Sequence, residues 1–395
     1  PLVRLKSGDR RSQLLASLEI RTRIMSHEHH AAIVVGTGGV GSAAMYHLAK
    51  RGLDVLGIDQ FPPAHDRGSS HGHTRIIRQA YFEHPDYVPL LERAYELWSQ
   101  LEQRQSQRLY HEVGVLEIGP TDGEVIPGVL RSAREHDLMV EELTGSDLQR
   151  RFPGFRMPDG FAAVFEQHAG FLRVEDCVLA HVEQAQRQGA ELIGSEAVTG
   201  WQATADGVVV ETADGRFEAR GLVVTAGAWA AGLLADLDVE LKVLRKHLHW
   251  YGNGDPRYRE DAGCPVFFYE LPEGLFYGFP QIDDLGVKFA EHSGGEAVAD
   301  PSVLDRAMDP EEALRSERFQ QSWLPDIAGP RTRHEVCMYT MSPDGHFLVD
   351  RHPRWPQVCF AAGLSGHGFK FASVLGELLA DLALQGDSPL PYEFL

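Results

Sequence analysis

A glycine-rich turn between two apolar segments carries the residues whose spacing most clearly predicts chemistry. Residues 31–35 are apolar, Gly36, Gly38 and Gly41 follow with the spacing GxGxxG, and Asp59 ends the next apolar segment. Such glycines let the backbone approach a pyrophosphate, whose charge lies at the N-terminus of the following helix. A carboxylate about 20 residues further on accepts hydrogen bonds from a ribose hydroxyl. The pattern predicts a βαβ unit that binds an adenine dinucleotide; the alternative is a chance glycine turn in an unrelated α/β domain.

Two later segments carry a thiol and a cation that could be reactive. Cys337 lies in a predicted strand, residues 335–341, whose alternation places Tyr339 on the same face. A single cysteine is most often an inert buried residue, and a reactive one needs a nearby base or positive field. Lys288 and His292 share a face of another predicted strand. A lysine there is usually a surface charge at a strand edge, and otherwise a buried cation with a function.

Basic residues also flank two turn-rich segments. Arg75 and Arg78 follow the βαβ unit. They could be surface charges, but guanidinium groups beside a dinucleotide fold are also candidates to bind a carboxylate with two hydrogen bonds. A second glycine-rich turn contains Gly366 and Lys370 and precedes the last predicted helix. Its glycine density favours close approach to a ligand over a plain strand-to-helix turn, and the helix N-terminus would stabilise an anion.

The surrounding pattern predicts an α/β protein in which a Rossmann-like domain is interrupted by a second unit. We expect helices at 39–50, 87–103, 126–136, 145–151, 174–188 and 371–384, and strands at 31–35, 53–59, 113–118, 191–193, 200–204, 208–212, 216–219, 221–227, 347–350 and 358–362. The nucleotide domain is expected at 31–110, 170–242 and 344–395, the mostly antiparallel α+β substrate domain at 111–169 and 243–343, and an N-terminal extension at 1–30. Within that extension, Met25 resembles a natural start and the histidines resemble an exposed leader.

Composition and charge exclude several classes. With 395 residues the chain suits two or three domains, and 43% apolar and 24% charged residues are ordinary for a soluble globular protein. A net charge of -20 argues against nucleic acid or an anionic membrane as the partner. The four cysteines form no CxxC pair and no metal-ligand spacing occurs. We therefore expect reduced thiols, no metal site, no membrane span and a cytoplasmic location.

Four motifs in this order resemble the family of monomeric sarcosine oxidase and N-methyltryptophan oxidase. The motifs are GHTRIIR at 72–78, YGFP at 277–280, VCMYT at 336–340 and SGHGFKF at 365–371. The resemblance extends from Ala31 to the last helix. It implies an FAD-dependent amine oxidase with a Rossmann-like FAD-binding domain, in which a nearby loop residue, aspartate in the family, is His73 here.

The resemblance also implies a role for individual residues. It implies that Cys337 forms a thioether to the flavin, that Lys288 lies over the flavin and promotes its reaction with oxygen, and that Arg75 packs against the flavin. Gly36, Gly38, Gly41 and Asp59 keep the dinucleotide role derived above. Together with Lys288 and Arg75, it implies a catalytic role for His292, near the substrate. The other site residues that it implies are, for the cofactor, His71, Thr74, Gly366 and Lys370 and, for the substrate, Arg78, Tyr277, Tyr339 and Lys370.

The expected reaction is the oxidation of a secondary amine. FAD takes a hydride equivalent from the carbon beside the nitrogen, the imine hydrolyses to an aldehyde and an amine, and dioxygen becomes hydrogen peroxide. The expected substrate is an N-methyl amino acid such as sarcosine or N-methyltryptophan, and the expected state is a monomer. Alternatives are a flavin dehydrogenase with another electron acceptor, a non-catalytic nucleotide-binding sensor, and a nicotinamide enzyme, which would not need Cys337.

Overall fold

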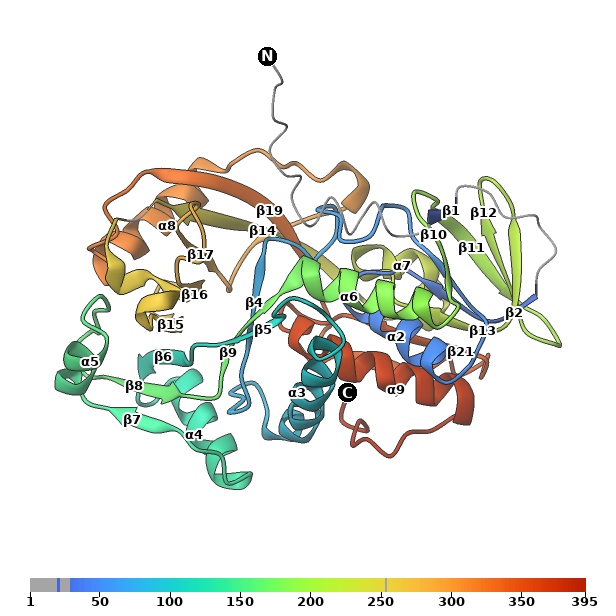
Figure 1. Ribbon diagram of the computed structural model, residues 1–395. Coiled ribbons are helices and arrows are strands. Elements are labelled where there is room, and N and C mark those ends of the chain that lie inside the picture. The colour runs from blue at the N-terminus through green and yellow to red at the C-terminus, as the bar shows by residue number, and fades with distance from the viewer. Residues whose placement is uncertain (1–19, 22–28, 253) are drawn as a thin grey trace, which may run out of the picture.

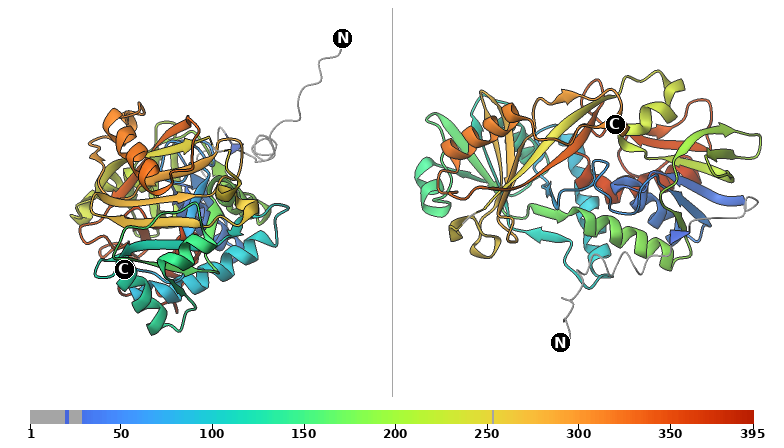
Figure 2. Two further views of the ribbon diagram at one scale, coloured as in Figure 1. Left: turned by 90° about the vertical axis from the view of Figure 1, so that its left-hand side faces the viewer. Right: turned by 90° about the horizontal axis from the view of Figure 1, so that it is seen from above.

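The computed structural model describes residues 20–21, 29–252 and 254–395, which form two lobes (Figure 1). Each lobe is built on a nine-stranded sheet, and a small three-stranded sheet lies at their junction. Viewed from above, the lobes lie side by side along the long axis of the molecule (Figure 2).

The first sheet consists of β1 (Ile20–Arg21), β2 (His29–Val35), β3 (Val55–Ile58), β10 (Glu191–Ile193), β11 (Val198–Ala203), β12 (Val208–Thr212), β13 (Arg216–Val224), β20 (Leu348–Arg351) and β21 (Val358–Ala362). Its order is β1-β10-β3-β2-β13-β12-β11, and β21 pairs with β13 and β20. The pairs from β1 to β13 are parallel, as is the pair of β13 with β21. The predicted strands at 216–219 and 221–227 form one continuous strand, β13.

Strand β2 shows how this sheet is buried on both faces. Ile33 and Val35 belong to one apolar cluster, while Ala32 and Val34 belong to the cluster on the other face. Such a strand is a continuous apolar run rather than an alternating one. The helices that contribute to the second cluster include α2 (Gly39–Lys50), α6 (Val174–Arg187) and α9 (Ala372–Gln385). The prediction of α2 is confirmed, and α6 and α9 pack against it so that residues 39–49 are all buried.

The second sheet consists of β6 (Val115–Pro120), β7 (Glu141–Leu143), β8 (Phe161–Glu166), β14 (Lys242–Tyr251), β15 (Val266–Leu271), β16 (Gly274–Phe279), β17 (Val287–Glu291), β18 (Glu296–Ala297) and β19 (Arg331–Met341). Among the described strands of this sheet, only β15 and β6 pair in parallel, so the mostly antiparallel character is confirmed. Strand β16 pairs with β17 and places Phe279 opposite Lys288. Strand β19, with 11 residues, is longer than the strand predicted at 335–341, and it pairs along its length with the 10 residues of β14.

The third sheet corrects the sequence analysis. Strands β4 (Thr74–Ile77), β9 (Gly170–Arg173) and β5 (Tyr110–Glu112) form it in the order β4-β9-β5. The sequence predicts a loop for the segment that contains Arg75, because its many turn-forming residues obscure the short Ile76-Ile77 pair. Backbone pairing with β9 instead makes it a strand, with Arg75 opposite Leu172. This strand gives the arginine a fixed direction.

The predicted N-terminal extension contains residues that pair with the first sheet. Ile20–Arg21 forms β1 beside β10, and β2 begins at His29, so these residues belong to the first sheet. His30 is buried, with Nδ1 3.2 Å from a carboxylate oxygen of Asp54, and is not part of an exposed leader. Met25 and the other residues at 1–19 and 22–28 lie outside the described ranges. The domain ranges stay a prediction.

The remaining helices are α3 (Val88–Glu102), α4 (Val125–Glu135), α5 (Gly145–Arg151), α7 (Ala230–Leu233) and α8 (Pro310–Trp323). Helix α5 has its predicted bounds, and α3 and α4 begin and end within one residue of theirs. No helix in the described ranges combines the length and the apolar character that crossing a bilayer requires.

Gly41 is the glycine of the βαβ unit with the least space for a side chain. A Cβ there would lie 1.8 Å from the carbonyl oxygen of Gly36 and 2.5 Å from Oγ1 of Thr225. We predict that Gly41→Ala lowers the free energy of unfolding by about 2 kcal/mol, because the turn must open. Gly232→Ala is the control, since a Cβ added there would meet no atom within 4 Å. Equal stability of the two variants in urea would contradict the packing described.

Candidate active site

A cavity of about 530 Å³ connects the glycine-rich turn with the second sheet. Gly36, Gly38 and Asp59 line one end. The predicted site residues that line the rest of it are Arg75, Arg78, Tyr277, His292, Tyr339, Gly366 and Lys370. These residues lie on β4, β16 and β19, directly after β2, β3 and β17, and in the turn before α9, so both lobes line the cavity.

The glycine end has the geometry of a dinucleotide turn. Gly36 has a φ of +85°, which glycine adopts without strain. The Oδ2 atom of Asp59 accepts a hydrogen bond from the backbone N–H of Thr37 at 2.6 Å. Ser70 Oγ accepts one from the N–H of Gly39 at 3.1 Å, at the start of α2. Asp59 is therefore held at the tip of β3 with its carboxylate on the cavity wall.

Arg75 connects the cavity wall with the thiol behind it. Its Nη2 atom donates to the carbonyl oxygen of Ser69 at 2.8 Å and contacts Sγ of Cys337 at 3.3 Å. Burial would raise the pKa of the Cys337 thiol, but Arg75 and His71 beside it lower that pKa to about 7. A buried thiol in such a positive environment has the reactive thiolate character that an ordinary core cysteine lacks. Burial raises the pKa of the other three cysteines.

Lys288 lies one layer behind the wall and fixes the segment that carries Arg75. Its Nζ atom donates to the carbonyl oxygens of Gly72 at 2.6 Å and Thr74 at 3.0 Å, and to Oγ1 of Thr74 at 3.1 Å. Burial and the nearby Arg75 lower the pKa of Lys288 well below its ordinary value. The ammonium is thus held by neutral oxygens close to the cavity.

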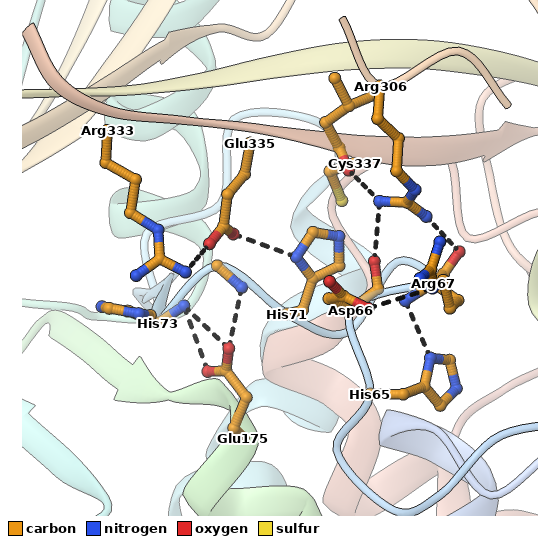
Figure 3. A network of polar contacts seen from close by, with 12 residues as sticks. His65, Asp66, Arg67, His71, His73, Glu175, Arg306, Arg333, Glu335 and Cys337 are labelled. Carbon is orange, nitrogen blue, oxygen red and sulfur yellow. Dashed lines mark hydrogen bonds and ion pairs between the residues drawn. The ribbon is translucent and has the colours of Figure 1, made fainter.

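Five of the predicted site residues are absent from the cavity wall. They are Gly41, His71, Thr74, Lys288 and Cys337. Gly41 supports the turn, while the others form a layer of polar contacts beneath Arg75. Figure 3 shows two of these residues, with the His71 ring between the carboxylate of Glu335 and the sulfur of Cys337.

At the opposite end of the cavity, Arg78 already has acidic partners. Its Nη2 atom donates to Oε2 of Glu83 at 2.7 Å, and its Nε atom lies 3.4 Å from Oε1 of Glu117. Burial raises the pKa of Glu117 to about 8, whereas the pKa of Glu83 is lowered to about 2 because Arg78 outweighs burial. Burial and Arg78 lower the pKa of Lys370 to about 7. The pair expected to bind a carboxylate therefore includes an arginine that must first exchange a protein carboxylate.

Aromatic and imidazole side chains lie between these two ends. Nδ1 of His292 is 3.3 Å from the hydroxyl of Tyr339, and its ring packs edge-on against Tyr277. Phe268 also packs against the ring of His292 and lines the cavity. Burial and the Lys246 ammonium lower the pKa of His292 to about 3, so the ring is neutral at ordinary pH.

Sequence reasoning missed several acids and one serine of this site. They are Ser70, Glu83, Glu117, Glu175 and Glu335. Glu117 carries the one usable signal, since it is an acid inside the apolar run of β6. The others lie in polar segments, where an acid has no distinguishing pattern. Within the described ranges, no group of three or more His, Cys, Asp or Glu residues is placed to hold a metal ion.

The fold and cavity define a class of protein: a Rossmann-like dinucleotide-binding domain with a mostly antiparallel lobe over its site. The chain belongs to the FAD dependent oxidoreductase family, whose sequence pattern matches residues 31–382. It is 42% identical over 365 residues to the monomeric sarcosine oxidase of Streptomyces avermitilis, covering 91% of this chain and 94% of that protein. These findings confirm the predicted family and fold class.

Two further similarities agree with this assignment. The chain is 40% identical over 362 residues to an N-methyl-L-tryptophan oxidase of Yersinia pestis, covering 91% of this chain and 96% of that protein. Among solved structures, it is similar to NikD, an unusual amino acid oxidase, with a TM-score of 0.82 and 26% identity. That similarity covers 93% of this chain and 96% of the other.

The neutral state of His292 predicts a pH dependence of stability. An unfolded histidine takes up a proton below about pH 6.5, whereas the folded one stays neutral until pH falls to about 3. The free energy of unfolding therefore falls with pH in this window, by up to about 1.4 kcal/mol per pH unit for this residue. When the pH is lowered from 7.5 to 5.5, we predict that the free energy of unfolding of His292→Asn falls by about 1 kcal/mol less than that of the unmodified protein. Equal losses in urea unfolding would show that His292 titrates normally in the fold.

Proposed function

We propose that this chain catalyses the FAD-dependent oxidation of a secondary amine, an N-methyl amino acid such as sarcosine or N-methyltryptophan, with dioxygen as the electron acceptor. The imine product hydrolyses to an aldehyde and an amine, and dioxygen leaves as hydrogen peroxide. The observation that carries the proposal is the single cavity that joins the dinucleotide turn to Arg75, His292 and Lys370. The names of the relatives, sarcosine oxidase and N-methyl-L-tryptophan oxidase, support the substrate class.

The residues along the cavity suit FAD. At one end, Gly36 and Gly38 leave room for a pyrophosphate, and Asp59 offers a carboxylate oxygen for a ribose hydroxyl. When bound, FAD supplies the hydride acceptor. We propose that Arg75 packs against its ring, because the guanidinium is held on the wall at the junction of the lobes. A fixed cation there stabilises negative charge that develops on the ring.

The substrate end recognises a carboxylate and keeps the amine reactive. Arg78 and Lys370 are the cations on this wall, and we propose that the substrate carboxylate displaces Glu83 from Arg78. The aromatic rings of Phe268, Tyr277 and Tyr339 exclude water around the carbon that is oxidised. The neutral ring of His292 does not repel the amine, and the amine must lose its proton before hydride leaves.

We also propose that the flavin is attached covalently to Cys337. The thiol lies 3.3 Å from the guanidinium that lines the cavity, and its pKa is lowered to about 7 by Arg75 and His71 against the effect of burial. A thiolate is the form that bonds to carbon. A monomer in the cytoplasm is part of the same proposal, since nothing in the reaction requires a second chain.

The proposed reaction predicts peroxide without an added electron acceptor. Purified protein supplied with sarcosine or N-methyltryptophan in air should release one hydrogen peroxide per amine oxidised, measured by a coupled peroxidase assay. The same compounds without the N-methyl group serve as controls and should react more slowly. Amine oxidation that needs an artificial acceptor would indicate a dehydrogenase. No change of the flavin spectrum with any amine would indicate a non-catalytic binding protein.

Lys288 is proposed to act in the step with dioxygen, because a buried cation stabilises the negative charge that oxygen acquires. We predict that Lys288→Met slows reoxidation of the flavin by about 100-fold or more and slows its reduction by the amine far less. Anaerobic and aerobic stopped-flow absorbance measure the two steps separately. Lys242→Met, at the exposed start of β14, is the matched control. Equal slowing of both steps would refute this role.

A further inference from the structure

Glu335 and Cys337 lie two residues apart on β19, so both side chains point to the same side of the strand. On that side they meet His71, from the segment between the βαβ unit and β4. Oε2 of Glu335 is 3.3 Å from Nδ1 of His71, and the other carboxylate oxygen pairs with Arg333. Figure 3 shows the resulting order of side chains: Arg333, Glu335, His71, Cys337.

The His71 ring is nearly fully buried, and its two nitrogens have different surroundings. Nδ1 faces Glu335. Nε2 has no hydrogen-bond partner of ordinary geometry among the described residues, and Cys337 is the thiol that this ring contacts. An imidazole between a carboxylate and a thiol has a fixed orientation and a fixed site for the thiol proton.

We infer that Glu335 is a positioning residue for the covalent attachment of the flavin: it holds His71 against Cys337 as the group that receives the thiol proton. This inference rests on the proposed attachment at Cys337. The charges agree with it, because Cys337 and then Glu335 raise the pKa of His71 to about 9 against the effect of burial, and His71, after Arg75, lowers that of Cys337. The pKa of Glu335 is itself lowered to about 2 by His71 and Arg333 against burial, so the carboxylate stays charged.

The attachment step balances without any further reagent. The S–H bond of Cys337 and one C–H bond of a methyl group on the flavin ring break, and one S–C bond forms. The thiol proton goes to His71, the methyl proton goes to solvent, and the ring retains two electrons and is reduced. Dioxygen, the acceptor of the proposed reaction, takes up these two electrons with two protons and leaves as hydrogen peroxide.

Other charged groups also influence the pKa of the Cys337 thiol, and they limit how much the removal of Glu335 can change it. The titratable groups that influence Cys337 from the neighbouring elements are His71, Arg75, Lys246, Tyr277, Lys288, Arg306 and Tyr339. Arg75 remains when Glu335 is removed, so some thiolate persists. Attachment should therefore become slower and require a higher pH rather than stop.

The test follows attachment separately from binding and from activity. The full chain is produced in riboflavin-limited cells and mixed with FAD in air. Quenching of protein fluorescence reports binding, and flavin fluorescence of the denatured band on a gel reports the covalent bond. We expect Glu335→Gln to bind FAD normally but to attach it about tenfold more slowly at pH 7, with the difference shrinking towards pH 9. Glu335→Asp should restore part of the rate.

Arg333→Gln is the matched control. It removes the second charged partner of Glu335, and the Arg333 side chain is 42% exposed, so its charge acts mainly in solvent. Its attachment rate should stay within about twofold of the unmodified rate. The inference is overturned if Glu335→Gln attaches FAD at the unmodified rate, or is slowed by one constant factor at every pH, as a structural role would require. If Glu335→Gln does not bind FAD, His71→Asn decides in the same assay, and an unmodified rate overturns the inference.

The same assay on the unmodified protein separates this inference from the proposed covalent attachment at Cys337, on which it rests. If it binds FAD and releases all of it on denaturation, the covalent attachment fails and the role of Glu335 fails with it, while peroxide formation is unaffected. If the unmodified protein keeps FAD on denaturation, and the Glu335 and His71 variants attach it as fast as Arg333→Gln does, the covalent attachment stands and only the inference fails.

Discussion

A buried cation needs partners, and this requirement joins the two lobes at the site. Lys288 of the second sheet meets it through the backbone oxygens of Gly72 and Thr74. Arg75, the residue after Thr74, meets it through Ser69 and the sulfur of Cys337 on β19. An unpaired buried charge costs several kcal/mol, so neither lobe can hold its part of the site alone. The position of the thiol relative to the cavity follows from these contacts.

The two ends of the cavity differ in how firmly their cations are held. At the junction, Arg75 and Lys288 are bound mainly by backbone oxygens, which cannot leave. At the far end, Arg78 donates to one backbone oxygen, that of Ala80, but also to Glu83, a side chain that a substrate carboxylate can replace. A fixed cation suits a cofactor that stays, and an exchangeable one suits a substrate that comes and goes. This difference is the physical basis for assigning the two ends to FAD and to substrate.

Much of the fold could be predicted because period-two and period-3.6 patterns report burial directly. The first residues of strand β13 alternate between exposed and buried before an apolar run, and the apolar residues of helix α9 recur with the helical period. The strand β4 could not be predicted, because its four residues depend on pairing with β9, which is distant in sequence. Resemblance identified the cations and the thiol. It could not identify Glu335, whose contact with His71 joins segments far apart in the sequence, or Glu83, which meets Arg78 within one segment.

The most direct test of this account is a crystal structure of the protein with its FAD bound. We expect the pyrophosphate at Gly36 and Gly38, a ribose hydroxyl on Asp59, and the flavin ring between Arg75 and the substrate wall with one edge at Sγ of Cys337. A ring outside the junction of the lobes, or one with Arg75 and Cys337 on distant sides, would contradict the account.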